Sequence, residues 1–200
     1  MAEEISPAAA PSPVTDSDLE PLLAADLDGW QMAGQGRFFW AADGILESEG
    51  GPGIFWYADS VYADFLLRVD WRTRTPEDNS GVFLRLPPLA HDLGPALRLG
   101  YEVQIDDRGI DPEANRSDCP LHLTGAVYRQ APAQGRLSRP VGAWNRFDIT
   151  FRGPTLCVWL NGAPVSRLDR GNRRPEGHVG LQAHHPGSRV QFRNLRIARL

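Results

Sequence analysis

The chain has 200 residues, of which 42% are hydrophobic, and a formal net charge of -4. This length and composition can build one sizeable hydrophobic core, so one folded domain is expected. All 21 basic residues are arginine, but they form no block, and the sequence therefore gives no sign of a nucleic-acid-binding surface. No apolar run is long enough to span a bilayer. The two cysteines, Cys119 and Cys157, lack the spacing of a metal site and give no disulfide framework on which the fold must rely.

The first 16 residues differ in composition from the rest of the chain. Ala, Pro and Ser predominate there, and the basic and apolar regions of a secretory signal peptide are missing. We therefore predict a disordered arm over residues 1–16, a single domain over residues 17–200 and a cytoplasmic location. Residues 17–27 could form one helical turn, and the strands are expected to begin near Gly29-Trp30.

Hydrophobic residues recur with a period of two over most of the remaining chain, which is typical of β-strands. Asn161-Gly162 is the strongest hairpin signal, because it suits the positive φ angles of a type I′ turn, and a slip of the apolar phase across Arg193-Asn194 predicts a β-bulge. With almost no amphipathic helix, these features predict an all-β fold, an antiparallel jelly-roll β-sandwich of about a dozen strands. The expected strands are 38–40, 45–49, 53–57, 65–71, 81–86, 100–106, 123–128, 144–152, 156–160, 163–168, 179–184 and 188–200, with long loops at 87–99, 106–122 and 129–142.

The segment from Gly100 to Asp107 has two opposite faces. Side chains alternate across a strand, which separates apolar Tyr101, Val103 and Ile105 from polar Glu102, Gln104 and Asp106. Three consecutive hydrogen-bonding side chains on one face could form the floor of a cleft for a polyhydroxylated ligand. The alternative is an ordinary solvated face of an antiparallel sheet.

A set of short motifs gives the chain a family resemblance. In order they are Gly29-Trp30, Asp43-Gly44, Asn79-Ser80-Gly81-Val82-Phe83-Leu84-Arg85, Gly100-Tyr101-Glu102-Val103-Gln104-Ile105-Asp106, Thr124-Gly125-Ala126-Val127-Tyr128, Trp144-Asn145, Trp159-Leu160-Asn161-Gly162, Gly180-Leu181-Gln182-Ala183-His184 and Phe192-Arg193-Asn194-Leu195. Each motif alone is weak, but the ordered set, over residues 27–200, resembles the 3-keto-disaccharide hydrolase domain family. The resemblance implies a concanavalin A-like sandwich and an activity on glycosides whose sugar is oxidised at C3. Members of that family are often exported. Because no signal peptide is recognised in this sequence, we do not extend that expectation to it.

A ketone at C3 acidifies the hydrogen on C2, so this substrate requires a base with a pKa near neutrality and a cation or hydrogen-bond donor for the developing oxyanion. Under the resemblance, His184 is the candidate base, Glu102 a second catalytic group and Arg85 the cation, with Gly81 leaving room for a sugar ring. The other candidate substrate-binding residues are Asn79, Gln104, Asp106, Gln182 and Tyr128.

Each of these roles has an alternative. His184 could cap the turn before Pro186-Gly187, and Arg85 could pair with Asp70 or Asp106 on a neighbouring strand. A carboxylate, an amide oxygen and an imidazole together could hold a divalent cation, although nothing in the spacing demands one. His122 could contribute to the rim of the cleft.

Three classes of function follow from these observations. The first is an enzyme that cleaves 3-keto glycosides or 3-keto-disaccharides by C2 proton abstraction and β-elimination, with or without rehydration. The second is a non-catalytic carbohydrate-binding module on the same scaffold, since one fold serves many functions. The third is an interaction domain tethered by its N-terminal arm. In the first two classes the partner is a carbohydrate, and the oligomeric state is left open.

Overall fold

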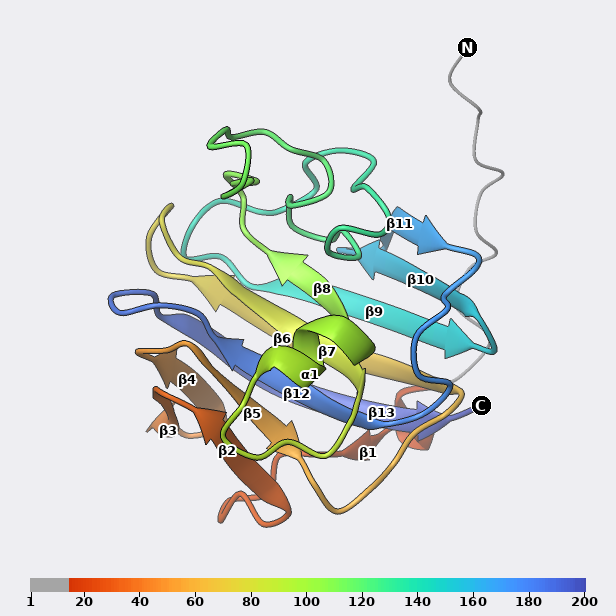
Figure 1. Cartoon of the computed structure of the whole chain (residues 1–200). Coiled ribbons are helices and arrows are strands. Elements are labelled where there is room, and N and C mark those ends of the chain that lie inside the picture. The colour runs from red at the N-terminus through yellow and green to blue at the C-terminus, as the bar shows by residue number, and fades with distance from the viewer. Residues whose placement is uncertain (1–14) are drawn as a thin grey trace.

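The computed structural model describes residues 15–200, which form two antiparallel β-sheets packed face to face (Figure 1). The predicted antiparallel jelly-roll sandwich is therefore confirmed, whereas most of the predicted disordered arm lies outside the described residues. Within residues 15–200, no helix combines the length and the apolar character that crossing a bilayer requires.

The larger sheet has eight strands in the order β11-β10-β9-β6-β13-β4-β3, with β1 paired to β13. Its strands are β1 (Glu20–Pro21), β3 (Arg37–Ala42), β4 (Ile45–Glu49), β6 (Phe65–Thr73), β9 (Asn145–Arg152), β10 (Thr155–Leu160), β11 (Ala163–Leu168) and β13 (Val190–Arg199). The smaller sheet has five strands in the order β2-β5-β12-β7-β8. Its strands are β2 (Trp30–Gly34), β5 (Gly53–Tyr57), β7 (Ser80–Leu86), β8 (Tyr101–Ile105) and β12 (His178–Ala183), and the helices are η1 (Asp16–Asp18) and α1 (Gly94–Leu99).

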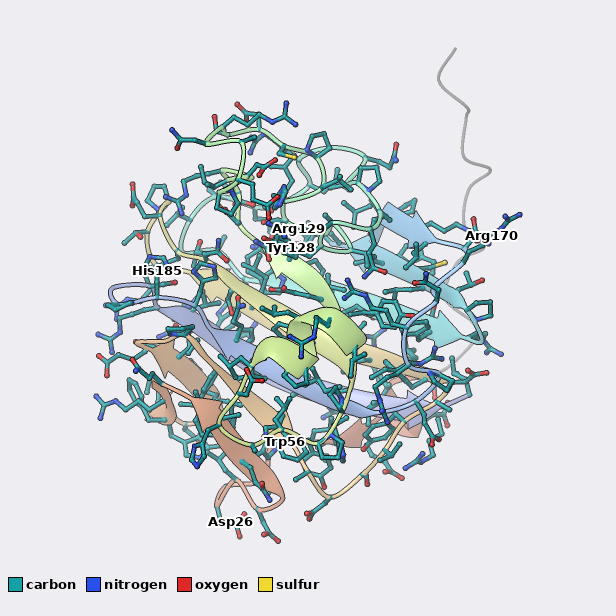
Figure 2. The ribbon with its side chains drawn as sticks, viewed as in Figure 1. Asp26, Trp56, Tyr128, Arg129, Arg170 and His185 are labelled. Carbon is teal, nitrogen blue, oxygen red and sulfur yellow. The ribbon has the colours of Figure 1, made fainter. Side chains whose placement is uncertain are left out.

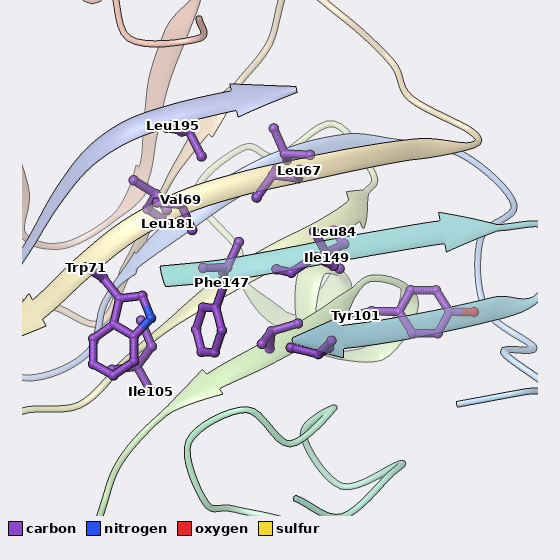
Figure 3. Close-up of a cluster of buried hydrophobic side chains, with 14 of the residues drawn as sticks. Leu67, Val69, Trp71, Leu84, Tyr101, Ile105, Phe147, Ile149, Leu181 and Leu195 are labelled. Atoms are coloured by element: carbon purple, nitrogen blue, oxygen red, sulfur yellow. The ribbon is translucent and has the colours of Figure 1, made fainter. Parts of the chain in front are cut away.

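The main hydrophobic core lies between the two sheets (Figure 3). Alternate residues of β6, among them Leu67 and Trp71, face alternate residues of the smaller sheet such as Leu84 and Leu181, and all four are fully buried. Burying a side chain of this size stabilises the fold by about 1.5–3 kcal/mol. Strands with a period of two thus form a sandwich because each sheet offers one continuous apolar face.

The local signals in the sequence specify the turns that they predicted. Asn161 and Gly162 have φ angles of 54° and 86°, as a type I′ turn between β10 and β11 requires. The register of β13 against β6 shifts between Arg193 and Arg196, and Asn194 has a φ of 51°, so the predicted bulge is confirmed.

Three local expectations need correction. The fold begins before Gly29-Trp30, because β1 already pairs with β13 and Leu22 is buried in the core. The loop 87–99 contains α1, which packs against β7 and β8. The expected strand 123–128 is a series of turns along the free edge of β8, where Gly125 has a φ of 86° and only Val127 bridges to Val103.

The long connection from β8 to β9 positions the functional site. It spans residues 106–144 and folds over one end of the smaller sheet, at the top of Figure 1. Its backbone covers the edge of β8: the Gly125 amide donates to the Gln104 carbonyl, and the Tyr128 amide donates to the Glu102 carbonyl. The outer face of β8 therefore lies under this connection and not in open solvent.

Candidate functional site

A cleft of about 710 Å³ lies on the outer face of the smaller sheet. Its floor comes from β7, β8 and β12, and its walls come from α1 and from the loops that follow β8 and β11. The lining residues are Pro52, Asn79, Phe83, Ala96, Leu97, Gly100, Glu102, Gln104, Arg108, Ile110, Pro112, Tyr128, Arg129, Arg173, Gln182 and His184. This volume falls within the usual range of small-molecule sites.

The two faces of β8 divide as the sequence predicts. Tyr101 and Val103 are part of the core between the sheets, while Glu102 and Gln104 line the cleft. Yet Glu102 is only 6% exposed and Gln104 only 3%. The alternative of an ordinary solvated face is therefore wrong, because the connection after β8 and helix α1 shield these polar groups from bulk water.

Burial raises the pKa of the Glu102 carboxyl to about 8, although the Arg129 and Arg173 guanidiniums act in the opposite direction. Gly81 lies on the neighbouring strand, and a Cβ atom there would come within 2.3 Å of Glu102 Oε1. The missing side chain of Gly81 therefore makes room for the Glu102 carboxylate, and not for a sugar ring as expected. At neutral pH the Glu102 carboxyl carries its proton.

His184 follows the last residue of β12 and lines the same cleft as Glu102. Burial lowers its pKa to about 4; His185 and Arg108 act in the same direction, and Asp106 opposes them. The Nδ1 atoms of His184 and His185 lie 2.8 Å apart, so one of the two rings donates a hydrogen bond to the other. The His184 imidazole is thus neutral at neutral pH and free to accept a proton, but its pKa lies below the near-neutral value expected of the base.

The cleft also contains a hydrogen-bonded cluster of amide side chains. Asp106, which is fully buried, accepts hydrogen bonds from Asn79 Nδ2 at 3.2 Å and from the Arg108 backbone N–H at 3.0 Å. Gln104 Nε2 donates to Asn79 Oδ1 at 3.5 Å. Asn79 and Gln104 line the cleft, whereas Asp106 lies behind them and positions Asn79. Of the substrate-binding residues expected from the sequence, Asp106 alone does not line the cleft.

Two side-chain carbonyl oxygens of residues that line the cleft have no donor within the described chain. Gln104 Oε1 and Gln182 Oε1 are buried, and neither accepts a hydrogen bond from any residue of the described chain. A buried acceptor without a donor is costly, which makes both oxygens candidates for a bond to a ligand hydroxyl. Sugar hydroxyls are donors of this kind.

Arg85 does not belong to the cleft, which corrects its expected role as the cation of the site. The register of β12 against β7 shifts between His178 and Gly180, and Arg85 has a φ of 48°. This bulge reverses the alternation, so Leu86 joins Phe83 on the outer face and Arg85 turns inward. There its guanidinium lies 3.5 Å from the centre of the Phe151 ring and donates to the Ala63 and Gly153 carbonyls. Arg85 is a structural residue.

The cations of the cleft come from loops. Arg108 and Arg129 lie on the connection after β8, and Arg173 lies between β11 and β12. The Arg129 guanidinium lies over the ring of Tyr128, and the two residues, which belong to the connection after β8, are labelled side by side in Figure 2. Sequence reasoning missed all three, since arginine is common throughout the chain. The feature of the sequence that could have identified them is their position on long loops between strands, where binding residues often lie.

One group of acidic, imidazole and thiol side chains lies close enough together to hold a metal ion. Among residues 15–200, only Asp111, Cys119 and His122 form a group of three such side chains within reach of one ion. Glu102 and His184 do not belong to it. His122 contacts the ring of Tyr128 edge to face and does not line the cleft. It therefore lies behind Tyr128, and not at the rim where it was expected.

The protein is a β-sandwich with a cleft, lined by both apolar and polar residues, on the outer face of its smaller sheet. The chain is similar to two proteins of Parabacteroides distasonis described as "putative glycosyl hydrolase". One has 24% identity and a TM-score of 0.72 over 91% of this chain and 99% of that chain. The other has 20% identity and a TM-score of 0.71 over 87% and 90%.

The same fold occurs in the carbohydrate-binding module CBM66 of Bacillus subtilis, with 13% identity and a TM-score of 0.60 over 85% of this chain and 95% of that one. No curated protein matches the sequence. The family is nevertheless defined, because the model of the 3-keto-alpha-glucoside-1,2-lyase-like domain matches residues 19–198. The chain belongs to that family, as its motifs indicated.

Proposed function

We propose that the protein cleaves glycosides whose sugar carries a ketone at C3. The observation that carries the proposal is the pairing of Glu102 and His184 in one cleft, with pKa values displaced in opposite directions. Two titratable groups whose environments separate their pKa values are suited to act as acid and base. Membership of the 3-keto-alpha-glucoside-1,2-lyase-like family supports the substrate class.

The chemistry is a β-elimination. A base removes the proton on C2, and the C2–H electron pair forms an enolate with the C3 carbonyl. The enolate then expels the C1 oxygen, which leaves with a proton from an acid, so a C1–C2 double bond conjugated to the ketone remains. Addition of water across that bond would make the net result hydrolysis.

His184 is the base in this proposal, since its imidazole is neutral at neutral pH and available to accept the C2 proton. Glu102 keeps its proton up to about pH 8 and donates it to the departing C1 oxygen. These protonation states coexist over the whole range between the two pKa values. The acid and the base are therefore both ready before the substrate binds.

The enolate oxygen requires a positive group, and Arg129 and Arg173 take the place that Arg85 was expected to fill. Both guanidiniums line the cleft and act electrostatically on Glu102. A fixed cation in a site shielded from water stabilises a developing oxyanion more strongly than it would in bulk solvent. The free acceptor oxygens of Gln104 and Gln182 bind hydroxyl groups of the sugar and fix its orientation.

A carbohydrate-binding module remains the second candidate function. It is favoured by the likeness to the CBM66 module and by the same two free acceptor oxygens, which would bind a sugar without any turnover. The two functions differ in one respect only, namely whether Glu102 and His184 transfer protons.

The test is an assay of the purified protein on a glycoside with a chromophoric leaving group, oxidised at C3, with the unoxidised glycoside as control. We expect release only from the oxidised substrate, and a primary isotope effect when C2 carries deuterium. His184→Ala should lower kcat by about 10²–10⁴-fold, the usual contribution of a general base, with little change in binding of the sugar.

His91→Ala is the matched control, since His91 is exposed and lies outside the cleft. It should keep full activity. If the unmutated protein binds the oxidised glycoside by calorimetry but never releases the leaving group, the binding module is the correct function. Equal activity of His184→Ala and His91→Ala would remove His184 from the mechanism.

A further inference from the structure

We propose that Asp111, Cys119 and His122 form a binding site for one zinc-like transition-metal ion, directly behind the wall of the cleft. One ligand atom from each side chain lies within 4.8 Å of the other two. In a tetrahedral zinc site the ligand atoms are roughly 3.3–3.6 Å apart, as zinc–sulfur and zinc–nitrogen bond lengths require. Small side-chain movements therefore suffice to close the site around an ion.

The three side chains are sheltered from solvent. Cys119 and His122 are each 4% exposed, and the Asp111 side chain is 16% exposed. His122 Nδ1 lies 3.1 Å from Cys119 Sγ, so the imidazole and the thiol already face each other. A buried thiol and imidazole, beside a half-buried carboxyl that accepts the Glu113 and Ala114 amides on Oδ1, would all gain a common partner in an ion.

Backbone hydrogen bonds hold the ligands in place before any ion binds. The Asp111 amide donates to the Arg116 carbonyl at 2.8 Å, and the Cys119 amide donates to the Gly109 carbonyl at 3.0 Å. The His122 amide donates to the Cys119 carbonyl at 2.9 Å, which closes the turn that places both ligands on one side. A pre-organised site of this kind loses little conformational entropy on binding.

The donor atoms select the kind of ion. Thiolate sulfur and imidazole nitrogen favour zinc and similar transition metals, whereas magnesium and calcium prefer oxygen ligands alone. Three protein ligands leave one coordination position for a water molecule. The two cysteines as a pair lack the spacing of a metal site, but Cys119 and His122 have the Cys-x-x-His spacing that brings two ligands together across a turn.

Arg116 and Arg129 lie beside the cluster, and neither is held there firmly enough to prevent an ion from binding. Arg116 is 65% exposed and reaches Asp111 and Cys119 only at 4.0 and 3.9 Å, so it is free to swing into solvent. Arg129 Nε lies 3.5 Å from His122 Nε2, at the limit of a hydrogen bond, and has a closer partner in Glu113 at 2.9 Å. With the ion on Nδ1, the proton would move to Nε2, and Arg129 would lose this contact but keep Glu113 and the ring of Tyr128.

A bound ion would tie the segment from Arg108 to Cys119 to the turn that follows it. Arg108, Ile110 and Pro112 of this segment line the cleft. Because binding to the folded protein alone raises its stability, the ion would rigidify this wall of the cleft. The site is thus distinct from Glu102 and His184 but adjacent to them.

The test uses the whole protein, freed of metal by a chelator and titrated with Co²⁺, whose absorption reports its ligands. We expect one equivalent to bind, with a thiolate-to-metal charge-transfer band and the d–d bands of a tetrahedral site. Zn²⁺ should displace the Co²⁺ and raise Tm. Cys119→Ser should remove the charge-transfer band and weaken binding by more than about 100-fold, because even loss of an outer partner of a ligand costs about 10–100-fold.

The matched control is Cys157→Ser, which alters the other buried cysteine, on β10, and should bind Co²⁺ as the unmutated protein does. If Cys119→Ser fails to fold, Asp111→Asn gives the same test at a side chain near the surface, again with an expected loss of more than about 100-fold in affinity. The proposal is overturned if the unmutated protein binds no equivalent of Co²⁺ or gives no charge-transfer band. It is equally overturned if Cys119→Ser keeps the band, or if Asp111→Asn binds Co²⁺ with unchanged affinity.

Discussion

Each sheet carries a buried carboxyl side chain on its outer face, but in the part of the chain that the structure describes only the one on the larger sheet accepts hydrogen bonds from neighbouring side chains. On the larger sheet, Asp70 of β6 accepts hydrogen bonds from Arg146 Nε at 2.8 Å, Asn194 Nδ2 at 2.8 Å and Arg193 Nε at 3.3 Å. On the smaller sheet, Glu102 is similarly buried, yet no hydrogen bond to its carboxylate exists within residues 15–200.

The pKa values of Asp70 and Glu102 are displaced in opposite directions for this reason. Burial by itself raises the pKa of Asp70, but the hydrogen bonds from Arg146, Asn194 and Arg193 outweigh it, and the net pKa is lowered. For Glu102 burial prevails, and the pKa rises to about 8. A carboxylate that is satisfied within the protein holds strands together, whereas one left without a partner is available to a ligand.

The largest expected effect concerns the pH dependence of turnover. The acid must be protonated and the base neutral, so kcat/KM should stay level between about pH 4 and about pH 8 and fall by about tenfold per pH unit outside that range. The charged groups that set these limits are Arg129 and Arg173 around Glu102, and His185, Asp106 and Arg108 around His184.

Glu102→Gln sharpens this prediction, because it should lower turnover and abolish the alkaline limb. Asp70→Asn is its counterpart on the other sheet and should leave both limbs unchanged. Steady-state rates from pH 3 to pH 10, with circular dichroism at each pH to confirm folding, provide the measurement. An alkaline limb that persists in Glu102→Gln would assign the acid to another group.

The second effect concerns Arg85 and tests whether it is structural. Arg85→Met leaves the Ala63 and Gly153 carbonyls without their buried donor, at a cost of about 2–4 kcal/mol in the free energy of unfolding. Chemical denaturation measures that loss. The folded variant should retain turnover, since Arg85 does not line the cleft. A stable variant with much reduced turnover would return Arg85 to the site.

The third effect isolates the position of the Glu102 carboxyl. In Gly81→Ala the new Cβ would lie 2.3 Å from Glu102 Oε1, so the flexible carboxyl must move while the strand stays in place. A displacement of this size should lower kcat by about tenfold or more. In the double variant with Glu102→Gln the added methyl group should cause no further loss. Additive losses would show that Gly81 acts independently of Glu102.

The smallest effect is expected on the larger sheet. Asp70→Asn removes the charge that Arg146 and Arg193 share, and because both arginines are partly exposed the cost is about 1 kcal/mol. The lowered pKa of Asp70 means that this stability is present above the unfolded pKa and is lost as pH falls. Unfolding curves of the two proteins should therefore converge below about pH 4. A constant difference down to pH 2 would contradict the pairing.

The extent to which the sequence predicted the site can be judged from β8 and β7. On β8, simple alternation correctly placed Glu102 and Gln104 on the face opposite Tyr101, and the motif ending in His184 brought its imidazole to the same cleft. On β7 the same rule failed at Arg85, because a bulge reverses the parity of the strand. Nothing in the letters around Arg85 signals that bulge, which arises in the pairing with β12.

What the sequence by itself determined is the sandwich, its turns and the polar face of β8, since these depend on periodicity between residues close together in the chain. Tertiary structure alone decided that Arg108, Arg129 and Arg173 surround the cleft, and that Asp111 meets Cys119 and His122. It also decided that Glu102 holds its proton and that His184 does not. Burial and charge at a point depend on distant loops folding over it, and local periodicity contains no information about that arrangement.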